Sequence, residues 1–409
     1  MGCWCGRVYT PSGFEDACIE VESGFIKAIT KSRMSRCQEV DLILPGFVDL
    51  HVHMRGLGQR HKGEWRTESL AALRGGVTVV VDMPNNVPRI DSDEALGMKL
   101  EEASRESYVD FLFYSAYPYL PDVNYVVGVK LFPRDLENDL NELFERASVL
   151  GKEVVVHAED PLVLREAEKP MNPEDHWRAH PELAEELAVR RVLSLAKRHS
   201  TKVRIAHSTL PSTLMLILEA KLCGIKATAE VTPHHILLSI EDSVKLGPLA
   251  KVNPPLRSRE VMRGLRAMVS AGLADFLVTD HAPHSREEKS RPYEEMPPGI
   301  PWLDVMAPFL LTLVERGDLP SRVLDMYSLH PARHLNLKRG SIAVGSIADL
   351  VILRKDRWVV KGDELSTKAK STAIEGMELG WCVDKVMIRG ELVYDDGPVV
   401  GEGFGRPAL

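Results

Sequence analysis

Asp49-Leu-His51-Val-His53-Met-Arg55 closes an apolar run that spans residues 43–50. Residues i and i+2 of a β-strand point to the same side, so His51 and His53 can bind one metal ion together. Arg55 lies one strand repeat further on, where its planar guanidinium can bind a carboxylate beside the metal. The stretch predicts a strand that ends in a metal site for an anionic substrate, with a packed or solvated histidine pair as the alternative.

Four further apolar runs end in a residue that suits the same chemistry. Residues at the C-terminal ends of parallel strands meet at one edge of a sheet or one mouth of a barrel. We therefore interpret these endings as parts of one site. The runs are Val126-Val-Gly-Val-Lys130, Glu153-Val-Val-Val-His157, Val203-Arg-Ile-Ala-His207 and Phe276-Leu-Val-Thr-Asp280.

Composition limits the classes of partner. The 409 residues are 44% hydrophobic and 27% charged, which is ordinary for a folded globular protein. The formal net charge of −8 comes without a basic cluster, so nucleic acid and anionic membranes are poor candidates and a small-molecule substrate fits better. The N-terminus lacks the pattern of a signal peptide and no apolar run reaches membrane-spanning length. We expect a cytoplasmic protein.

The cysteines show no zinc-type Cys-x-x-Cys pair. We interpret Cys3 and Cys5 as small half-buried residues of an N-terminal strand, with a thiolate site as the less favoured alternative. Glutamine occurs only at positions 38 and 59, a scarcity that resembles thermophile proteins, in which intracellular disulfides do occur. The six cysteines are Cys3, Cys5, Cys18, Cys37, Cys223 and Cys382.

The chain changes character near residues 47 and 336. Residues 6–41 and the segment that holds 349–353, 358–360 and 385–388 have short strand-like pieces and no helical period. We predict that residues 1–47 and 336–409 together form a small β-sandwich domain built from both termini.

Between these ends, strand-like runs alternate with helical periodicity. Helices are predicted over 137–150, 181–198, 211–223 and 259–271. Eight strands that alternate with helices predict an α/β fold of the (β/α)8 TIM-barrel type over residues 48–335. The eight runs end near Leu50, Asp82, Ser115, Lys130, His157, His207, Glu230 and Thr279.

The ordered motifs resemble the amidohydrolase superfamily and, within it, the type I dihydroorotases. The resemblance covers nearly the whole chain. Its motifs are His51-x-His53-x-Arg55, Met83-Pro-Asn85, Gly128-Val-Lys130-Leu-Phe, His157-Ala-Glu, His207-Ser, Thr232-Pro-His-His235, Asn253-Pro-Pro-Leu-Arg257, Thr279-Asp-His-Ala-Pro-His284 and Pro297-Pro-Gly-Ile-Pro301.

The resemblance implies two Zn²⁺ ions per subunit. His51, His53 and Asp280 would bind one ion, and His157 and His207 the other. Lys130 would bridge both ions as a carbamate (N6-carboxylysine), because an ammonium cannot ligate a cation and a neutral amine is scarce at a pKa near 10.4. A snorkelling or salt-bridged lysine is the alternative.

The implied reaction is the reversible cyclisation of N-carbamoyl-L-aspartate to (S)-dihydroorotate in de novo pyrimidine biosynthesis. A metal-bridging hydroxide would attack the ring amide carbonyl, since zinc lowers the pKa of bound water to roughly 7. Asp280 would act as the general acid and base between the hydroxide and the ring nitrogen.

Selectivity is expected to rest on the substrate carboxylate. Arg55, Asn85 and His284 resemble the carboxylate-binding trio of the family, and Asn253 with the backbone of Pro298 and Gly299 resembles the groups that meet the amide edges of the ring. A salt bridge for Arg55, and turn roles for the two asparagines, are the alternatives.

One departure concerns the residues after Arg55. Type I dihydroorotases commonly continue as Arg-Glu-Pro-Gly, whereas this chain reads Arg55-Gly-Leu-Gly58 and lacks the acidic residue. Other cyclic amidohydrolases of the hydantoinase, dihydropyrimidinase or allantoinase type remain alternatives; hydantoinases and dihydropyrimidinases usually lack the arginine. A silent scaffold subunit is disfavoured because all six ligand positions are filled. We also expect the protein to form a homo-oligomer and to associate with aspartate transcarbamoylase.

The remaining polar residues are predicted to be structural. His234 and His235 follow the seventh strand, Asp82 is expected to orient a neighbour, and residues 285–295 are expected to form a solvated loop over the mouth. Surface positions are predicted for His61, His176, His180, His199, His330 and His334.

Overall fold

Eight parallel strands in the middle of the chain form a barrel in the computed structural model, which describes residues 2–409. Neighbours in sequence are neighbours in the barrel, and the first and last strands meet where His53 N–H donates to His281 O at 2.8 Å. The predicted barrel is confirmed. Its strands are β5 (Phe47–Val52), β6 (Val77–Asp82), β7 (Asp110–Ala116), β8 (Val126–Leu131), β9 (Glu153–Val156), β10 (Lys202–Ile205), β11 (Ala227–Val231) and β12 (Phe276–Leu277).

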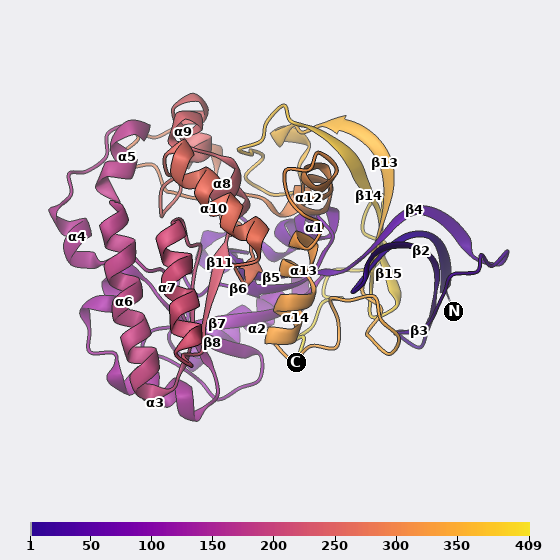
Figure 1. The fold of residues 1–409 in the computed structure, drawn as a ribbon, viewed down its shortest axis with the longest axis horizontal. Helices are drawn as coiled ribbons and strands as arrows, with labels where there is room; N and C mark the ends of the chain where they lie inside the picture. The colour runs from indigo at the N-terminus through magenta and orange to yellow at the C-terminus, as the bar shows by residue number, and fades with distance from the viewer. Residues whose placement is uncertain (1) are drawn as a thin grey trace.

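Helices surround the barrel (Figure 1). The four predicted helices exist, although α3 begins at Asn141 because residues 133–137 form a 3-10 turn instead. The longer helices are α1 (Trp65–Arg74), α2 (Asp93–Glu106), α3 (Asn141–Val149), α6 (Glu182–His199), α7 (Pro211–Leu222), α10 (Arg259–Ala271) and α12 (Met306–Glu315). The short ones are α4 (Pro161–Glu166), α5 (Pro173–Ala179), α8 (Pro233–Leu237), α9 (Ile240–Leu246), α11 (Arg286–Lys289), α13 (Val323–Met326) and α14 (Leu329–His334).

Helix α10 shows how local sequence sets an element. The Ser258 side chain accepts a hydrogen bond from Val261 N–H and so caps the first turn. Met262, Leu265 and Val269 recur at helical spacing and are buried, on a helix that packs against α7 and α8. The helix ends at Gly272, whose φ of 84° is the left-handed conformation that glycine adopts without a steric penalty.

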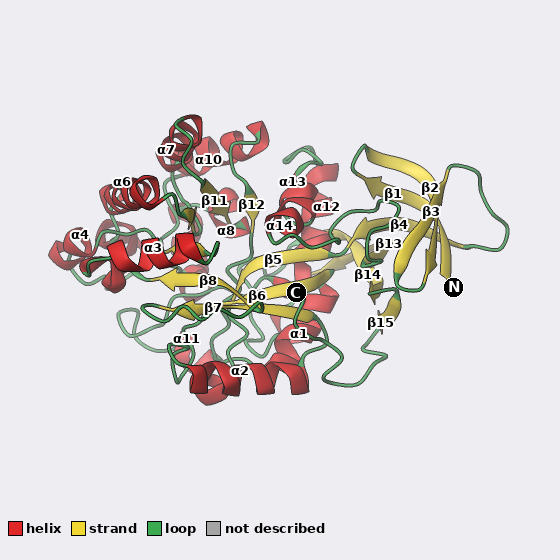
Figure 2. Ribbon diagram, turned by 90° about the horizontal axis from the view of Figure 1, so that it is seen from below, coloured by secondary structure: helices red, strands yellow, loops and turns green. Residues whose placement is uncertain are grey.

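Strands from the N-terminal and C-terminal parts of the chain pair in one seven-stranded sheet beside the barrel (Figure 2). Its order is β15-β14-β13-β4-β1-β2-β3, so the C-terminal strand β13 joins the N-terminal strand β4. Val8, Ile19 and Ile43 are fully buried in a separate apolar core of this sheet. The strands are β1 (Gly2–Thr10), β2 (Gly13–Glu22), β3 (Phe25–Thr30), β4 (Gln38–Pro45), β13 (Leu350–Val359), β14 (Glu378–Ile388) and β15 (Glu391–Asp395).

A buried ionic contact joins the sheet to the barrel. Arg339 lies 2.8 Å from a carboxylate oxygen of Asp110 on β7 and 3.0 Å from one of Asp349 beside β13. Gly46 N–H donates to Asp349 O at 2.8 Å, and a side chain at residue 46 would collide with Thr78 of β6. The sheet therefore contacts β6 and β7, and Gly46 links its strand β4 directly to β5, the strand that carries His51.

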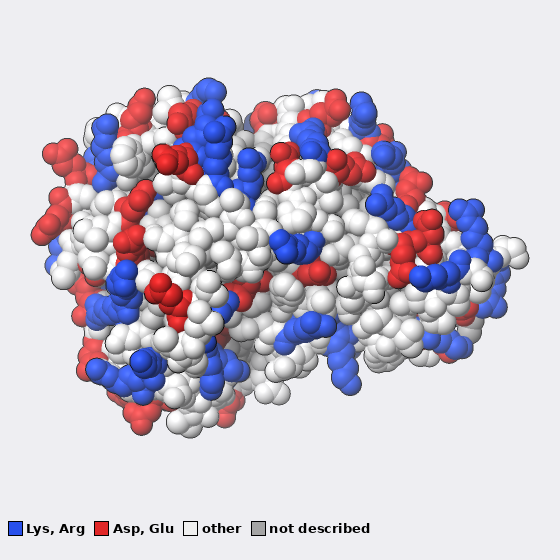
Figure 3. All heavy atoms as spheres, in the orientation of Figure 1, with Lys and Arg blue, Asp and Glu red and all other residues white. Residues whose placement is uncertain are grey.

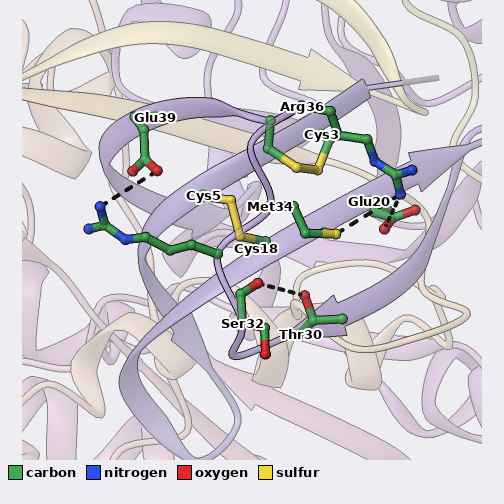
Figure 4. Close-up of a disulfide and its surroundings, with 11 residues drawn as sticks. Cys3, Cys5, Cys18, Glu20, Thr30, Ser32, Met34, Arg36 and Glu39 are labelled. Atoms are coloured by element: carbon green, nitrogen blue, oxygen red, sulfur yellow. Dashed lines mark hydrogen bonds and ion pairs between the residues drawn. A yellow bond between two sulfur atoms is a disulfide. The ribbon is translucent and has the colours of Figure 1, made fainter.

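Cys3 and Cys5 lie in an N-terminal strand as expected, but both form disulfides, which rules out the alternative of a thiolate site. Cys5 and Cys18 are bonded, and so are Cys3 and Cys37 (Figure 4). Cys5 and Cys18 lie directly opposite each other in the antiparallel pair of β1 and β2, a placement that brings β-carbons close enough for a disulfide. Sequence spacing did not show this pairing, because it depends on the register of the hairpin.

The face drawn in Figure 3 carries acidic and basic side chains interspersed over both parts of the molecule. Among residues 2–409, the structure contains no helix with the length and apolar character required to cross a bilayer.

Candidate active site

The C-terminal ends of the barrel strands surround a cavity of about 440 Å³. All twelve residues that the sequence assigned to a site line this cavity, although they come from separate parts of the chain. The twelve are His51, His53, Arg55, Asn85, Lys130, His157, His207, Asn253, Asp280, His284, Pro298 and Gly299.

Histidine and carboxylate groups converge at the base of the cavity. Nε2 of His51 and Nε2 of His53 lie 3.2 Å and 3.1 Å from Oδ1 of Asp280. One ligand atom each of His51, His207 and Asp280 fall within 4.8 Å of one another. The rings of His157 and His207 are 4.5 Å apart between centroids. Nitrogen and oxygen donors at such separations suit a divalent transition metal.

Lys130 lies among these groups without a partner. Its side chain is 1% exposed, and Nζ has no hydrogen bond to any of the described residues. Burial lowers the pKa of Lys130 to about 8, although Glu230 and Asp280 partly oppose the shift. An unpartnered buried amine is costly. Conversion to a carbamate that ligates metal would remove this cost, so the donor set fits a metal-bridging lysine.

Asp280 is held as an anion. Burial alone would raise the pKa of its carboxyl, but His51, His53 and Lys130 lower it below its usual range. Its backbone φ of 47° is unusual for a residue other than glycine, and functional sites often hold such conformations.

Arg55 lies at the wall of the cavity, and its positive charge is not balanced by a carboxylate of residues 2–409. Its side chain is buried, Nε donates to Pro283 O at 3.2 Å, and Nη2 lies 3.1 Å from Nε2 of His284. No carboxylate of residues 2–409 forms an ion pair with it, so the salt-bridge alternative finds no partner. Burial, then Arg55, keeps the pKa of His284 well below its usual value, so that imidazole is neutral. An anionic ligand would supply the missing charge.

The opposite wall offers amide groups. Oδ1 of Asn253 is buried without a hydrogen bond in the described chain. Gly299 N–H donates to Lys251 O at 2.9 Å, and a Cβ at residue 299 would lie 2.5 Å from Ala282 O. Glycine is therefore required for the backbone of Pro298 and Gly299 to approach the cavity this closely.

Comparison with known proteins agrees with this geometry. Residues 42–393 match the sequence profile of the amidohydrolase family. The chain belongs to this family. It is 34% identical over 411 residues to a dihydroorotase of Methanothermobacter thermautotrophicus, an alignment that covers 95% of this chain and 93% of the relative. A dihydroorotase of Pyrobaculum aerophilum is 35% identical, with coverage of 88% and 89%. This amidohydrolase is thus a cyclic amide hydrolase.

Solved structures share the fold of this amidohydrolase over its full length. An L-hydantoinase (dihydropyrimidinase) of Arthrobacter aurescens superposes with a TM-score of 0.92 at 25% identity, covering 100% of this chain and 99% of the other. A dihydropyrimidinase of Brevibacillus agri gives a TM-score of 0.87 at 24% identity, with coverage of 99% and 98%.

Carboxylates and amides behind the histidines orient their rings. Nδ1–H of His51 donates to Oε2 of Glu230 at 2.8 Å, and Nδ1–H of His53 donates to Oδ1 of Asn85 at 2.7 Å. Such hydrogen bonds fix which ring nitrogen is free to bind a metal. In this amidohydrolase Asn85 therefore also contacts a candidate ligand, besides its predicted place beside the substrate.

Glu159 orients the ring of His157 in the same way. Nε2–H of His157 donates to Oε2 of Glu159 at 2.5 Å, and Nδ1–H of His180 donates to the other carboxylate oxygen at 2.8 Å. The sequence analysis placed Glu159 in a motif and Glu230 at the end of a strand-like run without assigning either residue a role. Their positions directly after or at a strand end were the available signal.

Several predictions for other polar residues were wrong. His176 is 5% exposed, with Nε2–H donating to Val252 O at 3.0 Å, and His180 lines the cavity. The loop 285–295 is not wholly solvated, because Glu288 and Lys289 are buried on α11. Tertiary packing around the mouth covers these groups. Asp82, as predicted, orients a neighbour by accepting a 2.8 Å hydrogen bond from Met54 N–H.

Proposed function

We propose that this amidohydrolase is a dihydroorotase, which interconverts N-carbamoyl-L-aspartate and (S)-dihydroorotate in de novo pyrimidine biosynthesis. The buried guanidinium of Arg55, which has no carboxylate partner of its own, carries the proposal. Dihydroorotate bears a carboxylate on its ring, and a planar guanidinium binds that group with two parallel hydrogen bonds. The relatives named dihydroorotase support the same substrate.

We propose two Zn²⁺ ions per subunit as the cofactor. His51, His53 and Asp280 would hold one ion, His157 and His207 the other, and carboxylated Lys130 would bridge them. Zinc in this site would supply Lewis acidity, which polarises a carbonyl and lowers the pKa of water. The unpartnered buried Nζ of Lys130 supports this assignment.

The side chains of the cavity divide the remaining work. Arg55, with His284 and Asn85, would hold the ring carboxylate so that the scissile amide faces the histidines at the base. Asn253 and the backbone of residues 298–299 would hydrogen-bond the amide edges of the ring. These contacts fix one orientation of the substrate before the reaction, which is a large part of catalysis in a preformed site.

Asp280 would move the proton. In the hydrolytic direction, water adds to the ring carbonyl carbon, the bond between this carbon and the ring nitrogen breaks, and the nitrogen gains a proton. The carboxylate of Asp280 would take that proton from water and deliver it to the leaving nitrogen. Cyclisation reverses each of these transfers.

A second candidate is a cyclic amidohydrolase of the hydantoinase, dihydropyrimidinase or allantoinase type. The superposition on an L-hydantoinase favours it. A ring that lacks a carboxylate would leave Arg55 buried and unpaired, which disfavours this candidate. A silent scaffold is disfavoured because all six candidate ligands line the cavity.

The test is turnover of four rings by one preparation of protein with zinc and bicarbonate: dihydroorotate, dihydrouracil, hydantoin and allantoin. Turnover confined to dihydroorotate is the expected result. Turnover of a ring without the carboxylate would give Arg55 another role and promote the second candidate. Activity on none of the rings would promote the silent scaffold.

We also propose that the enzyme is a cytoplasmic homo-oligomer that associates with aspartate transcarbamoylase, whose product it would consume. Large apolar side chains exposed along residues 162–187 supply apolar surface for a contact with another chain. They are Leu162, Met171, Trp177, Leu183 and Leu187. Sedimentation of the purified protein, alone and with the transcarbamoylase, tests both statements.

A further inference from the structure

A chain of buried charged side chains runs from the candidate metal ligand His51 down the inside of the barrel. Oε1 of Glu230 lies 2.8 Å from Nη1 of Arg204, and Nη2 of Arg204 donates to Oε1 of Glu153 at 2.8 Å. The second oxygen of Glu153 lies 2.7 Å from Nε2 of His334, near the opposite end of the barrel. Glu230, Arg204 and Glu153 are at most 4% exposed. We call these three residues the charged column.

The stagger of the barrel strands builds the charged column. Glu153, Arg204 and Glu230 lie on the adjacent strands β9, β10 and β11. Arg204 pairs with Val155 on one side and with Thr228 on the other, so it stands two residues above Glu153 and two below Glu230. Each step moves the chain of charges closer to the mouth. Side chains two residues apart point to the same side of a strand, so the three can share the barrel interior.

The column occupies a place that apolar side chains normally fill. Barrel interiors are usually layers of branched aliphatic residues. Here Val48, Leu50 and Val79 supply such a layer on the other side of the barrel, whereas the charged column shares the interior of β9 to β11 with the apolar side chains of Val155 and Ala206. Burying ions is costly, and a pair of ions is a poor source of stability compared with apolar packing. A gain in the stability of the fold is therefore a weak explanation for the charged column.

The upper end of the charged column contacts the imidazole ring of His51. Oε2 of Glu230 accepts a hydrogen bond from Nδ1–H of His51 at 2.8 Å. The other oxygen, Oε1, forms an ion pair with Nη1 of Arg204. Nε2 of His51 then lacks a proton and faces Asp280, 3.2 Å away. A carboxylate that could rotate freely would not fix the ring in this way. The ion pair with Arg204 opposes this rotation, together with a 3.3 Å hydrogen bond that His207 N–H donates to Oε2 of Glu230. Glu153 in turn holds Arg204, helped by the hydroxyl of Tyr114.

We propose that Glu230 is a positioning residue that fixes the ring and the tautomer of His51 for metal binding, and that Arg204 and Glu153 act through Glu230. The inference rests on the proposed function, because it assigns these residues to the metal site described there. It makes metal affinity depend on two side chains that lie below the cavity and do not line it.

The experiment titrates metal-stripped protein with Zn²⁺ in competition with a chromophoric chelator. Glu230→Gln and Arg204→Met are compared with the wild type, with folding checked by circular dichroism. Carboxylates that orient ligating histidines typically change metal affinity by about 10- to 100-fold when removed. We expect Glu230→Gln to weaken one of the two zinc sites by that factor, and Arg204→Met to weaken the same site by a smaller one.

Arg339→Met is the matched control. It also removes a buried arginine from carboxylates, those of Asp110 and Asp349, but at the junction of sheet and barrel. We expect a lower melting temperature with unchanged zinc affinity. If Glu230→Gln does not fold, Glu153→Gln at the far end of the column takes its place in the comparison.

The outcomes separate the two proposals. Wild-type affinity in folded Glu230→Gln and Arg204→Met, or an equal loss in Arg339→Met, overturns the positioning role and leaves the proposed function intact. A wild-type protein that binds no divalent ion overturns the proposed metal site and this inference with it.

Discussion

The backbone N–H of Leu57 donates a 2.7 Å hydrogen bond to Oε2 of Glu102, which reaches it from helix α2. Gly56 has a φ of 68°, and a Cβ at this residue would collide with the same carboxylate. Arg60 pairs with the other oxygen of Glu102. A carboxylate from α2 thus fills the space beside the loop that follows Arg55. Glycine therefore fits residue 56 of this chain, the position at which the resemblance to type I dihydroorotases leads us to expect an acidic residue.

Replacing this carboxylate should loosen the loop that carries Arg55. Hydrogen bonds to charged groups contribute about 1.5–3 kcal/mol, and Glu102 makes two such contacts. We expect Glu102→Ala to raise KM for dihydroorotate by about 10-fold while zinc content is retained. Steady-state kinetics and metal analysis measure the two effects. The neighbouring exposed Glu101→Ala is the control, and an unchanged KM for Glu102→Ala would contradict the role.

Removing the guanidinium of Arg55 should weaken substrate binding rather than metal binding. The loss of a charge-assisted contact of about 1.5–3 kcal/mol corresponds to a decrease of roughly 10- to 100-fold in kcat/KM for dihydroorotate. We expect Arg55→Met to show this through a raised KM with two zinc ions retained. Arg178→Met changes an exposed arginine on α5 and serves as the reference. Unchanged dihydroorotate kinetics would remove Arg55 from the substrate site.

Loss of the Lys130 amine should remove the bridge between the metals. The side chain is buried with no other partner in residues 2–409, so its removal breaks no hydrogen bond of the folded chain. We expect Lys130→Ala to stay folded, to bind less zinc and to lose most of its turnover. Metal content and dihydroorotate hydrolysis measure both. Normal values for both would show that Lys130 is not carboxylated and does not bridge.

Strand endings carried most of the site prediction. His51, His157, His207 and Asp280 each follow an apolar run, and the closure of a parallel barrel brings such positions together wherever they lie in the sequence. Arg55 was found in the same way, by its distance from the two histidines. These are local patterns, and one regular architecture converts them into a single cavity.

The sequence did not predict the residues that act by holding another part of the chain in place. Glu102 contacts the Leu57 loop only because α2 packs beside it, and the role of Glu230 depends on the stagger of three strands. His176 was predicted at the surface because its neighbours in sequence are polar, but α5 turns it toward Val252. The cysteine pairs likewise depend on strand register. Contacts set by tertiary packing leave no local pattern to read.

The two disulfides should stabilise the N-terminal sheet. They link residues 13 and 34 positions apart, and closing a loop of about 15 residues is worth roughly 3 kcal/mol in the entropic account. We expect reduction, or the double variant Cys5→Ser/Cys18→Ser, to lower the melting temperature. Calorimetry with and without a dithiol reductant measures this. Cys223→Ser, which changes a free exposed cysteine, should have no effect. Six titratable thiols in the unreduced protein would contradict the pairing.

The buried amine of Lys289 should make stability depend on pH. Lys289 lies on α11 beside the mouth, where Nζ donates to Pro248 O at 3.1 Å. Burial, with the nearby cations Lys251 and Arg55, lowers its pKa from 10.5 to about 7. Between these values the unfolded chain binds a proton that the folded chain does not hold. The contribution of Lys289 to the free energy of unfolding therefore rises with pH across this window, by up to about 1.4 kcal/mol per pH unit.

The variant Lys289→Met lacks the titrating amine. Its comparison with the wild type therefore isolates the contribution of Lys289 to the pH dependence of the free energy of unfolding. Urea unfolding of the wild type and the variant at several pH values between about 6 and 9 gives the difference in free energy of unfolding at each. We expect the wild type to gain stability relative to Lys289→Met as the pH rises above about 7, because only the wild type has an amine whose buried charge is lost in that range. Lys197→Met, at an exposed site on α6, should give a difference that does not vary with pH. A difference for Lys289→Met that is flat or falls with pH would mean that the amine stays protonated in the fold, and that the groups around the mouth stabilise its charge despite its burial.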